Sequence, residues 1–594
     1  MKQKMNFFWI AGIVFSLSTT LFSQNESVES FEARRDAYLA RNGVGNEHCG
    51  QTIWAWLENN DQSKAATIHD IIQQWGTSNA WGDWGDYCMP WRTGADWTCV
   101  FLLRILYQYP DRISTEDYDF LTDLFHDTMR DKYFFRVGDP YQALNINNGA
   151  MAYTARYLHS QYEKDLTVTF GLADADELDT FTYNGNTYVA GTKVNSFAIA
   201  RDWLYLFFEK LLTEGDRELQ SCYARAFIIS LQALYDFAED PVMKQKAKMM
   251  LDFVLLESII EVSGTLQGGL PGRTYGHLIL DGQPKIYQYI YWGIGEVDPS
   301  SIMGQYYDAY VSTYRLPELI YDIGILDDES DSYYHMTRMN NRTDFLPAKE
   351  GKWNYVTKRY NLGGANRGWM MNVKSDDYDG EGIRFWINGD DSIGETGWGE
   401  TVTEENYIDL GKLGFQYKNA MLIRLDYSYI HFALTGNTFN SDETVSGWRF
   451  LKENKVVVAI RLKQYIGGLE VCTIGVDYAS YDEFKSAVIN NAYLGTKGDF
   501  HTSRGDVITL QIGSSPDYLY YTYVNGELYT DFPFPRIECI DNSGNKIIQW
   551  NNRVMTVKKH GTTAVYDFIN WTYVTGSDVE PPDAPQGVTV TPKE

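Results

Sequence analysis

The sequence predicts an α+β chain in which an N-terminal helical (α/α) toroid is followed by a C-terminal antiparallel β-sandwich. Apolar residues recur at helical spacing from about residue 29 to residue 342, and short segments of alternating polarity follow. About 570 mature residues exceed what one hydrophobic core usually holds, so we expect two or three domains. We place the toroid at residues 24–345 and the sandwich at residues 346–575.

The chain opens with an export-signal pattern at residues 1–23. Lys2 and Lys4 give a positive start, residues 7–22 supply an apolar stretch, and a plausible cleavage point precedes Gln24. The apolar stretch contains several hydroxyl residues and falls short of the roughly 20 apolar residues of a membrane-spanning helix. We therefore expect a secreted or periplasmic protein with no membrane anchor.

The first half is built from segments with the helical period. They are SKAATIHDIIQQW, DWTCVFLLRILYQY, STEDYDFLTDLFHDTMRDKY, NNGAMAYTARYLHSQY, SFAIARDWLYLFFEKLLTE, ELQSCYARAFIISLQALYDFAED and PVMKQKAKMMLDFVLLESIIEV. Ser114 precedes acids in a first turn, which marks a helix start. Consecutive helical hairpins without a fixed-period repeat favour a toroid over a solenoid. Asn184-Gly185 predicts the turn of an inserted β-hairpin.

The second half alternates polar and apolar residues between turn signals. Its predicted strands lie in WNYVTKRYNLGG, GWMMNVKS, GIRFWING, AMLIRLDYSYIHFALTGN, SGWRFLKENKVVVAIRLKQY, LEVCTIGV, DVITLQIG and YLYYTYVNGELYT. Such short strands are typical of antiparallel sheets. Residues 576–594 are rich in proline and acids and are expected to form a linker. Within them, PPDAPQGVTV resembles the opening strand of a fibronectin type III domain.

Composition narrows the classes of partner. The chain has 44 Tyr and 17 Trp, whose flat amphipathic rings suit stacking on sugars as well as core packing. A net charge of -28 argues against nucleic acid or an anionic membrane as partner, and a polyanionic substrate would need local cations. The six cysteines show no zinc-type spacing. A disulfide among Cys49, Cys88 and Cys99 and simple burial as small hydrophobes are the two alternatives for the N-terminal three.

The segment Gly264–Gly282 carries the densest set of chemically useful groups. Arg273, Tyr275 and His277 stand at every second position among glycines. In an extended chain, side chains two apart share one face, so a cation, a phenol and an imidazole would point into the same space. The alternative is a glycine-rich connector between two helices.

With this order of domains on an exported, aromatic-rich chain, the protein resembles the polysaccharide lyases of the chondroitin/hyaluronate, alginate and heparinase II/III-like groups. The resemblance implies a site in the toroid cleft, beside the sandwich, built from Asn, His, Tyr and often Arg. NINNGAMAY supplies Asn147 and Asn148, together with Asn145, and RTYGH supplies the remainder. Tyr287 lies at about the offset from His277 that the chondroitin-type enzymes show, so it is a rival to Tyr275.

The chemistry of β-elimination accounts for this set of residue types. The C5 proton of a 4-linked uronate is weakly acidic, and hydrogen bonds or positive charge on the neighbouring carboxylate stabilise the enolate-like intermediate. Asn148 and Arg273 are assigned to that carboxylate. His277 is the candidate base and Tyr275 the candidate acid, with an exchange of these two roles left open. No cofactor is required.

A tryptophan-rich segment, residues 81–97, offers a second interpretation. Its sugar-binding candidates are Trp84, Trp91, Arg92 and Trp97, to which we add Asn147 and Tyr287 as substrate-binding candidates. Its carboxylates Asp83, Asp86 and Asp96 instead suit the paired acid and base of a hydrolase. A tryptophan-rich loop packed in the core is a third interpretation.

Each candidate has a structural alternative. Asn147 and Asn148 would serve as caps if a helix began at Gly149. Arg273 would serve as a surface ion-pair residue and His277 as a partly buried histidine. His335 and His431 lack the spacing of a metal site, so no metal is predicted. The predicted function is a uronate-specific polysaccharide lyase acting on an anionic polymer such as ulvan, glucuronan or alginate. A uronate oligosaccharide hydrolase or dehydratase and a noncatalytic carbohydrate-binding protein are the alternatives.

Overall fold

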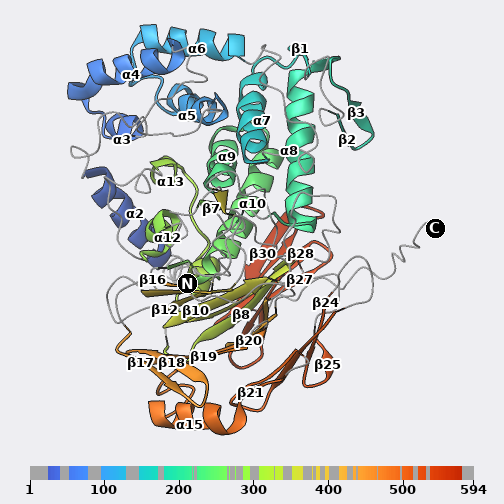
Figure 1. Ribbon diagram of the computed structural model, residues 1–594. Coiled ribbons are helices and arrows are strands. Elements are labelled where there is room, and N and C mark those ends of the chain that lie inside the picture. The colour runs from blue at the N-terminus through green and yellow to red at the C-terminus, as the bar shows by residue number, and fades with distance from the viewer. Residues whose placement is uncertain are drawn as a thin grey trace, which may run out of the picture.

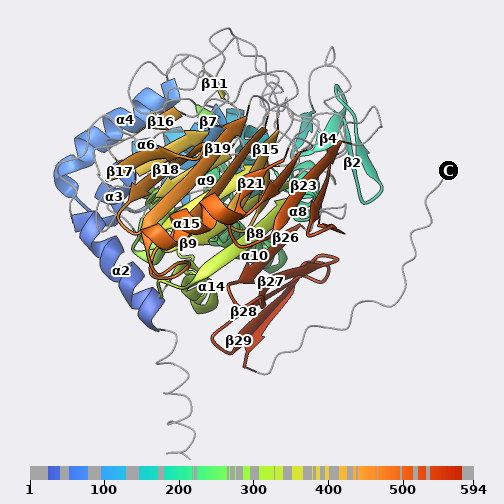
Figure 2. The same ribbon diagram turned by 60° about the horizontal axis from the view of Figure 1, so that its bottom comes forward.

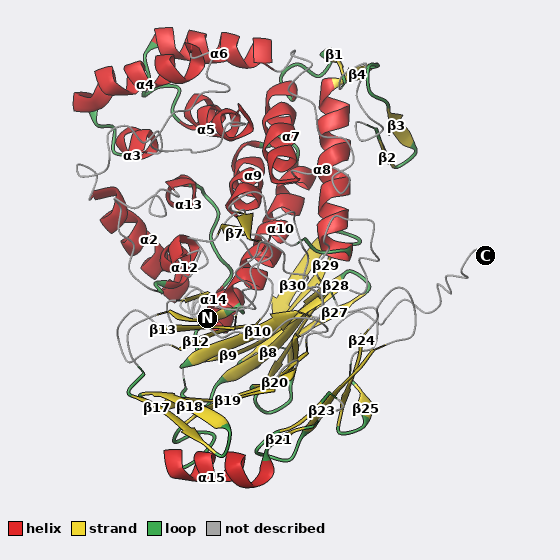
Figure 3. Cartoon of the chain, viewed as in Figure 1, coloured by secondary structure: helices red, strands yellow, loops and turns green. Residues whose placement is uncertain are grey.

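The chain divides into a helical first half and a sheet-rich second half (Figure 1). The computed structural model describes residues 25–40, 52–77, 95–128, 146–170, 180–216, 219, 224–263, 266–267, 274–275, 285–294, 307–326, 328–338, 351–365, 377–378, 383–387, 395–399, 414–424, 433–435, 439–463, 466–495, 498–512, 520–529 and 536–577. Helices gather above the sheets in Figure 3, and the sheets come forward when the molecule is turned (Figure 2). The expected α+β content is confirmed, whereas closure of the helices into a toroid and the sandwich arrangement of the sheets stay predictions.

Helices account for most of the described residues before residue 325. They are α2 (Asn25–Ala40), α3 (Thr52–Glu58), the 3-10 helix η1 (Gln62–Lys64), α4 (Ala65–Thr77), α5 (Ala95–Gln108), α6 (Thr115–Thr128), α7 (Ile146–Ser160), α8 (Ser196–Thr213), α9 (Ala224–Phe237), α10 (Pro241–Ile259), α12 (Lys285–Trp292), α13 (Tyr307–Val311) and α14 (Glu318–Gly324). Ser114 Oγ accepts a hydrogen bond from the backbone N–H of Asp117 at 3.0 Å, which confirms the predicted cap of α6. Asp240 caps α10, whose first residue is Pro241.

Short strands connect some of these helices. They are β1 (Thr167–Thr169), which pairs with β4 (Lys193–Asn195), β2 (Phe181–Tyr183), which pairs with β3 (Asn186–Tyr188), and β5 (Val262–Ser263), which pairs with β6 (Leu266–Gln267). Between β2 and β3, Asn184 and Gly185 both have positive φ, 47° and 82°. Two positive φ values are what a two-residue type I′ turn requires, so the predicted hairpin is confirmed.

The second half contains three larger antiparallel sheets. In order across the first, the eleven strands described are β16 (Ala433–Thr435), β13 (Glu395–Gly399), β12 (Ile383–Ile387), β10 (Tyr360–Ala365), β9 (Gly351–Thr357), β8 (Ser332–Arg338), β26 (Ile537–Asp541), β27 (Lys546–Asn551), β28 (Val554–Lys559), β29 (Thr562–Asp567) and β30 (Thr572–Gly576). The second has β14 (Gly414–Tyr417), β15 (Ala420–Arg424), β20 (Ile466–Thr473), β19 (Val456–Lys463), β18 (Trp448–Glu453) and β17 (Ser441–Val445). The third has β21 (Tyr493–Leu494), β22 (Asp499–His501), β23 (Val507–Ile512), β24 (Tyr520–Val524) and β25 (Glu527–Leu528).

The two faces of the eleven-stranded sheet belong to different cores. Tyr333, Val356 and Ile537 join the large core that the helices form. Tyr360 and Leu362 instead pack in a core with residues of the six-stranded sheet. Because side chains alternate across a strand, His335 on β8, Lys352 on β9 and Asn361 on β10 share the helix-facing side of the sheet. Polar residues on this helix-facing side are therefore enclosed between the two halves.

Some boundaries differ from those expected. β8 is central to the large sheet although it precedes residue 346, where we expected the strands to begin. An additional helix, α15 (Tyr481–Asn491), interrupts the strands, capped by Ser480. Cys99 is 1% exposed, and because Cys49 and Cys88 lie outside the described residues, the disulfide and burial alternatives both stay predictions. Within the described residues, no helix combines the length and apolar character that crossing a bilayer demands.

Candidate functional site

The segment that was expected to carry the catalytic groups connects α10 to α12. Its two described residues beyond β6, Thr274 and Tyr275, form the strand β7. β7 pairs in antiparallel fashion with β11 (Asp377–Tyr378), placing Tyr275 opposite Asp377. The backbone at Tyr275 is therefore extended, which is the condition under which alternate side chains share one face, and it is joined to a strand of the second half.

The remaining members of the predicted set are described only in part. Arg273 and His277 lie outside the described residues, as do the side chains of Tyr275 and Asn148. Asn147 is 3% exposed and lies in the first turn of α7. Because α7 begins at Ile146 rather than Gly149, Asn147 and Asn148 are helical residues, and the interpretation of these two as caps is wrong.

Tyr287 lies in α12 and is 2% exposed. It belongs to the large hydrophobic core between the helices, so packing accounts for its ring. Of the ten predicted site residues, the structure describes the side chains of Asn147 and Tyr287, which come from different helices. The grouping of the four catalytic candidates stays a prediction.

The tryptophan-rich segment lies almost entirely outside the described residues. This holds for Trp84, Trp91 and Arg92, and for the carboxylates Asp83 and Asp86 of the hydrolase alternative. Asp96 and Trp97 lie in the first turn of α5, and their side chains are not among those described. The sugar-binding and hydrolase interpretations of this segment both stay predictions.

A buried polar layer lies where α10 ends and the Gly264–Gly282 segment begins. Lys352 Nζ on β9 lies 2.7 Å from Oε1 of Glu261, and both side chains are essentially inaccessible to water. His335 on β8 places Nδ1 3.4 Å from the same carboxylate. Asn361 on β10 donates a 2.7 Å hydrogen bond to the backbone carbonyl of Glu261. Three strands of the second half thus contact one residue just beyond α10.

A second ion pair extends this layer one turn back along α10. Arg536 makes two hydrogen bonds to Glu257, at 3.0 and 2.8 Å, in a bidentate arrangement. Thr337 Oγ1 donates to Glu257 at 3.0 Å, and Arg536 Nε donates to the carbonyl of Leu211 at 2.7 Å. The Arg536 and Glu257 side chains are 1% and 3% exposed. Such buried charges are tolerated because they are paired and hydrogen-bonded.

This layer fixes the point from which the candidate segment departs. Ser263, in β5, donates a 2.7 Å hydrogen bond to the carbonyl of Thr357 on β9. Glu257, Glu261 and Ser263 therefore tie consecutive turns of the chain to the sheet. We call the side chains of Glu257, Glu261, His335, Lys352 and Arg536 the interface layer. Its charges neutralise one another, so its chemistry suits positioning of the segment rather than contact with a polymer.

A cavity of about 400 Å³ lies elsewhere, at the β27–β28 region of the large sheet. Its polar lining includes Asp331, Lys546, Lys558 and His560. None of the predicted site residues lines it. Lys559, which also lines it, donates to Ile325 carbonyl at 2.8 Å and to the Tyr333 hydroxyl at 3.0 Å, so that cation is engaged within the protein.

Sequence patterns did not predict the interface layer or the grouping of His126, His159 and Glu163, three side chains of the types that bind metal ions. The interface layer has no local signature, since Arg536 and Glu257 are 279 residues apart. The spacing of His159 and Glu163, four residues apart across a helix end, was a readable signal for the second group.

Comparison with known proteins gives little further information. No protein-family model and no curated protein matches the sequence. Among solved structures, the chain is similar to a chondroitinase AC lyase studied as enzyme–oligosaccharide complexes, with 10% identity over 91% of this chain and 90% of that chain. The TM-score is 0.37. At that value the likeness carries no argument about the fold or the activity of this chain.

Proposed function

We propose that the chain is a polysaccharide lyase that cleaves a uronic-acid-containing polymer by β-elimination. The observation that carries the proposal is the pairing of β7 with β11. It supports an extended backbone at the centre of the Arg273–His277 segment, which is the conformation that directs alternate side chains to one face. It also ties that segment to the second half of the chain, and enzyme sites commonly lie between such halves.

In the proposed mechanism, each residue type has one task. Arg273 and the amide of Asn148 bind the uronate carboxylate and stabilise the charge that develops on it. His277 removes the C5 proton, and Tyr275 protonates the departing glycosidic oxygen. The C4–O4 bond breaks and a C4–C5 double bond forms, so water is not consumed. Arg273 also supplies the local positive charge that a polyanion requires on a chain of net charge -28.

The test measures the conjugated 4,5-unsaturated uronate by its ultraviolet absorbance. Purified protein is mixed separately with ulvan, glucuronan, alginate and glycosaminoglycans, and we expect a rise with at least one uronate polymer. Release of reducing ends without the absorbance rise would instead identify the hydrolase alternative. Polymer binding without any product would identify the noncatalytic one.

Substitutions then test the assignment of residues. We expect His277→Ala and Tyr275→Phe each to lower kcat by about 10²- to 10⁴-fold, the usual contribution of a general acid or base. Matched controls are His69→Ala and Tyr118→Phe, whose side chains lie elsewhere on α4 and α6 and reach solvent. Full activity in both site variants would refute the assignment while leaving the reaction class intact.

We also propose that the protein is exported, on the support of the N-terminal pattern alone. Expression of the full-length chain with its own N-terminus, followed by N-terminal sequencing of the protein recovered outside the cytoplasm, tests this. We expect the mature chain to begin near Gln24. Recovery of the intact chain from the cytoplasm would contradict the proposal.

A further inference from the structure

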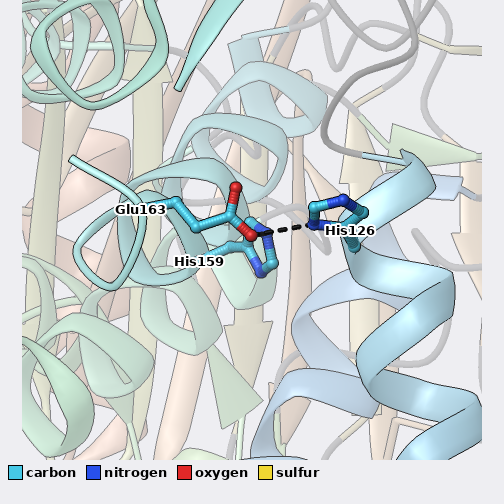
Figure 4. Close-up of side chains that lie close together, drawn as sticks. All are labelled: His126, His159 and Glu163. Atoms are coloured by element: carbon cyan, nitrogen blue, oxygen red, sulfur yellow. Dashed lines mark hydrogen bonds and ion pairs between the residues drawn. The ribbon is translucent and has the colours of Figure 1, made fainter. Parts of the chain in front are cut away.

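Three metal-ligand side chains meet at the outer end of the helical half. His126 comes from the last turn of α6, His159 from the last turn of α7, and Glu163 from the turn that follows α7. Their ligand atoms all lie within 4.8 Å of one another. Figure 4 shows the Glu163 carboxylate placed between the two imidazoles. Among the residues that the structure describes, no other three ligands of this kind converge so closely.

The distances are close to those of a metal-binding set. His126 Nδ1 lies 2.8 Å from Glu163 Oε1, and His159 Nε2 lies 3.8 Å from the same oxygen. Ligands about 2.0–2.2 Å from a tetrahedral zinc ion lie roughly 3.3 Å from one another. The two measured distances bracket this value, and the ligand atoms of the two imidazoles lie no more than 4.8 Å apart, so movement of the side chains alone would bring all three to an ion. The ring planes of the two histidines are inclined at 68° with their centroids 6.5 Å apart, so the rings are not stacked on each other.

The surroundings also favour a cation. The C-terminal ends of α6 and α7 both lie at this group, and the partial negative charge of a helix C-terminus stabilises a cation. The His159 side chain is 11% exposed, whereas those of His126 and Glu163 are 35% and 34% exposed. One ligand is therefore held rigidly and the other two are open to an ion arriving from solvent. Glu163 is itself positioned by a 3.2 Å hydrogen bond from its backbone N–H to Ser160.

We propose that His126, His159 and Glu163 form a binding site for a zinc-type divalent ion, with a water molecule as the fourth ligand. Two histidines and a glutamate are an established zinc ligand set. His159 lies twelve residues along α7 from Asn147, or about 18 Å at the helical rise, so the site is separate from the Asn147 and Asn148 candidates at the other end of that helix. The ion would fasten the end of α6 to α7. This inference is independent of the proposed lyase activity.

The test compares the zinc content of the full mature chain with that of single variants. After treatment with a chelator, each protein is titrated with Zn²⁺ by calorimetry and, separately, with Co²⁺ while its visible absorbance is followed. We expect Glu163→Gln and His126→Asn to lose one equivalent of high-affinity metal relative to the unsubstituted chain. Loss of a residue that only hydrogen-bonds to a metal ligand typically weakens metal binding by about 10- to 100-fold. Loss of a ligand itself should weaken it by at least as much.

His69→Gln is the matched control. His69 Nδ1 lies 2.8 Å from Asp117 on α6, which reproduces the histidine–carboxylate contact without the third ligand. This variant should keep the full metal content, and near-ultraviolet circular dichroism of all variants without metal should match that of the parent. Equal metal stoichiometry and affinity in the parent, Glu163→Gln and His126→Asn would overturn the proposal, leaving these side chains as a hydrogen-bonded pair beside a histidine.

Discussion

The interface layer beneath α10 and the His126/His159/Glu163 group at the ends of α6 and α7 differ in how much water reaches their charges. Arg536 and Glu257 are 1% and 3% exposed, whereas His126 and Glu163 are 35% and 34% exposed. A buried charge must keep its partner because no solvent can replace it. A half-exposed charge exchanges its partner for water or an ion at little cost. The first arrangement therefore suits the joining of two halves, and the second suits reversible binding.

The largest loss of stability is expected when the buried Arg536–Glu257 pair is broken. Arg536→Met should destabilise the protein by about 3–5 kcal/mol, because it leaves the Glu257 carboxylate buried without its cation. The measurement is the midpoint of denaturant unfolding, followed by both tryptophan fluorescence and circular dichroism. Two probes are needed because a chain of this size need not unfold in one step.

Arg449→Met is the matched control for that substitution. Arg449 also forms a bidentate pair, with Asp442 at 3.0 and 2.7 Å, but these side chains are 41% and 47% exposed. Its loss should cost no more than about 1 kcal/mol. If both variants shifted the midpoint equally, burial would not be what distinguishes the interface layer.

The sequence predicted those features that short-range physics decides. The cap at Ser114 and the turn at Asn184-Gly185 depend on a few neighbouring residues, and both are confirmed. Ser480 and Glu483 form a readable capping pair, with Glu483 N–H donating to Ser480 Oγ at 3.2 Å and Ala479 N–H donating to the Glu483 carboxylate at 2.9 Å. The helix they begin, α15, was overlooked among the strands around it.

Long-range pairs lacked any such signal. Lys352 and Glu261 are 91 residues apart. The pattern around Lys352 indicates only a strand, and that around Glu261 indicates only the end of a helix. Their contact arises only when α10 packs on the sheet, which periodicity cannot specify. For the candidate site, the sequence left open whether the segment around Tyr275 is extended or a glycine-rich connector, and both the extended backbone at Tyr275 and its partner strand β11 came from the structure.

A smaller effect on stability, one that depends on pH, is expected from Lys246 and Lys248, two lysines of α10 in contrasting surroundings. Burial lowers the pKa of Lys246 to about 8, and its Nζ lies 3.6 Å from the Tyr205 ring centroid and 4.6 Å from that of Trp571. Burial also lowers the pKa of Lys248. The charge of Asp252 and a 2.7 Å hydrogen bond from Lys248 Nζ to its carboxylate outweigh that effect, so the pKa of Lys248 is raised.

The two lysines should therefore give opposite pH dependences. Between pH 8 and about 10.5, the unfolded chain binds more protons at Lys246 than the folded chain does, so this residue makes stability rise with pH by about 1–2 kcal/mol after allowance for solvent screening. Lys248 makes the stability fall as the pH rises above the ordinary pKa of a lysine. The unfolding midpoint of Lys246→Met, compared with the parent between pH 8 and about 10.5, and that of Lys248→Met, compared with the parent above about 10.5, should change with pH in opposite directions. Parallel profiles would show that the two surroundings are equivalent.

The smallest effect is expected at the partly exposed His69–Asp117 pair. The hydrogen bond and charge of Asp117 raise the pKa of His69 above its ordinary value. A histidine with a raised folded-state pKa stabilises the protein fully below the unfolded value near 6.5, and this contribution is lost as the pH rises through the folded value. His69→Gln should therefore lower the melting temperature slightly at pH 5.5 and leave it unchanged at pH 9.

Asp117 keeps its hydrogen bonds from Gln73 and Ser114 in the variant, which limits the loss of stability. A difference of the same size at both pH values would mean that packing of the imidazole, rather than its charge, supports α4 against α6.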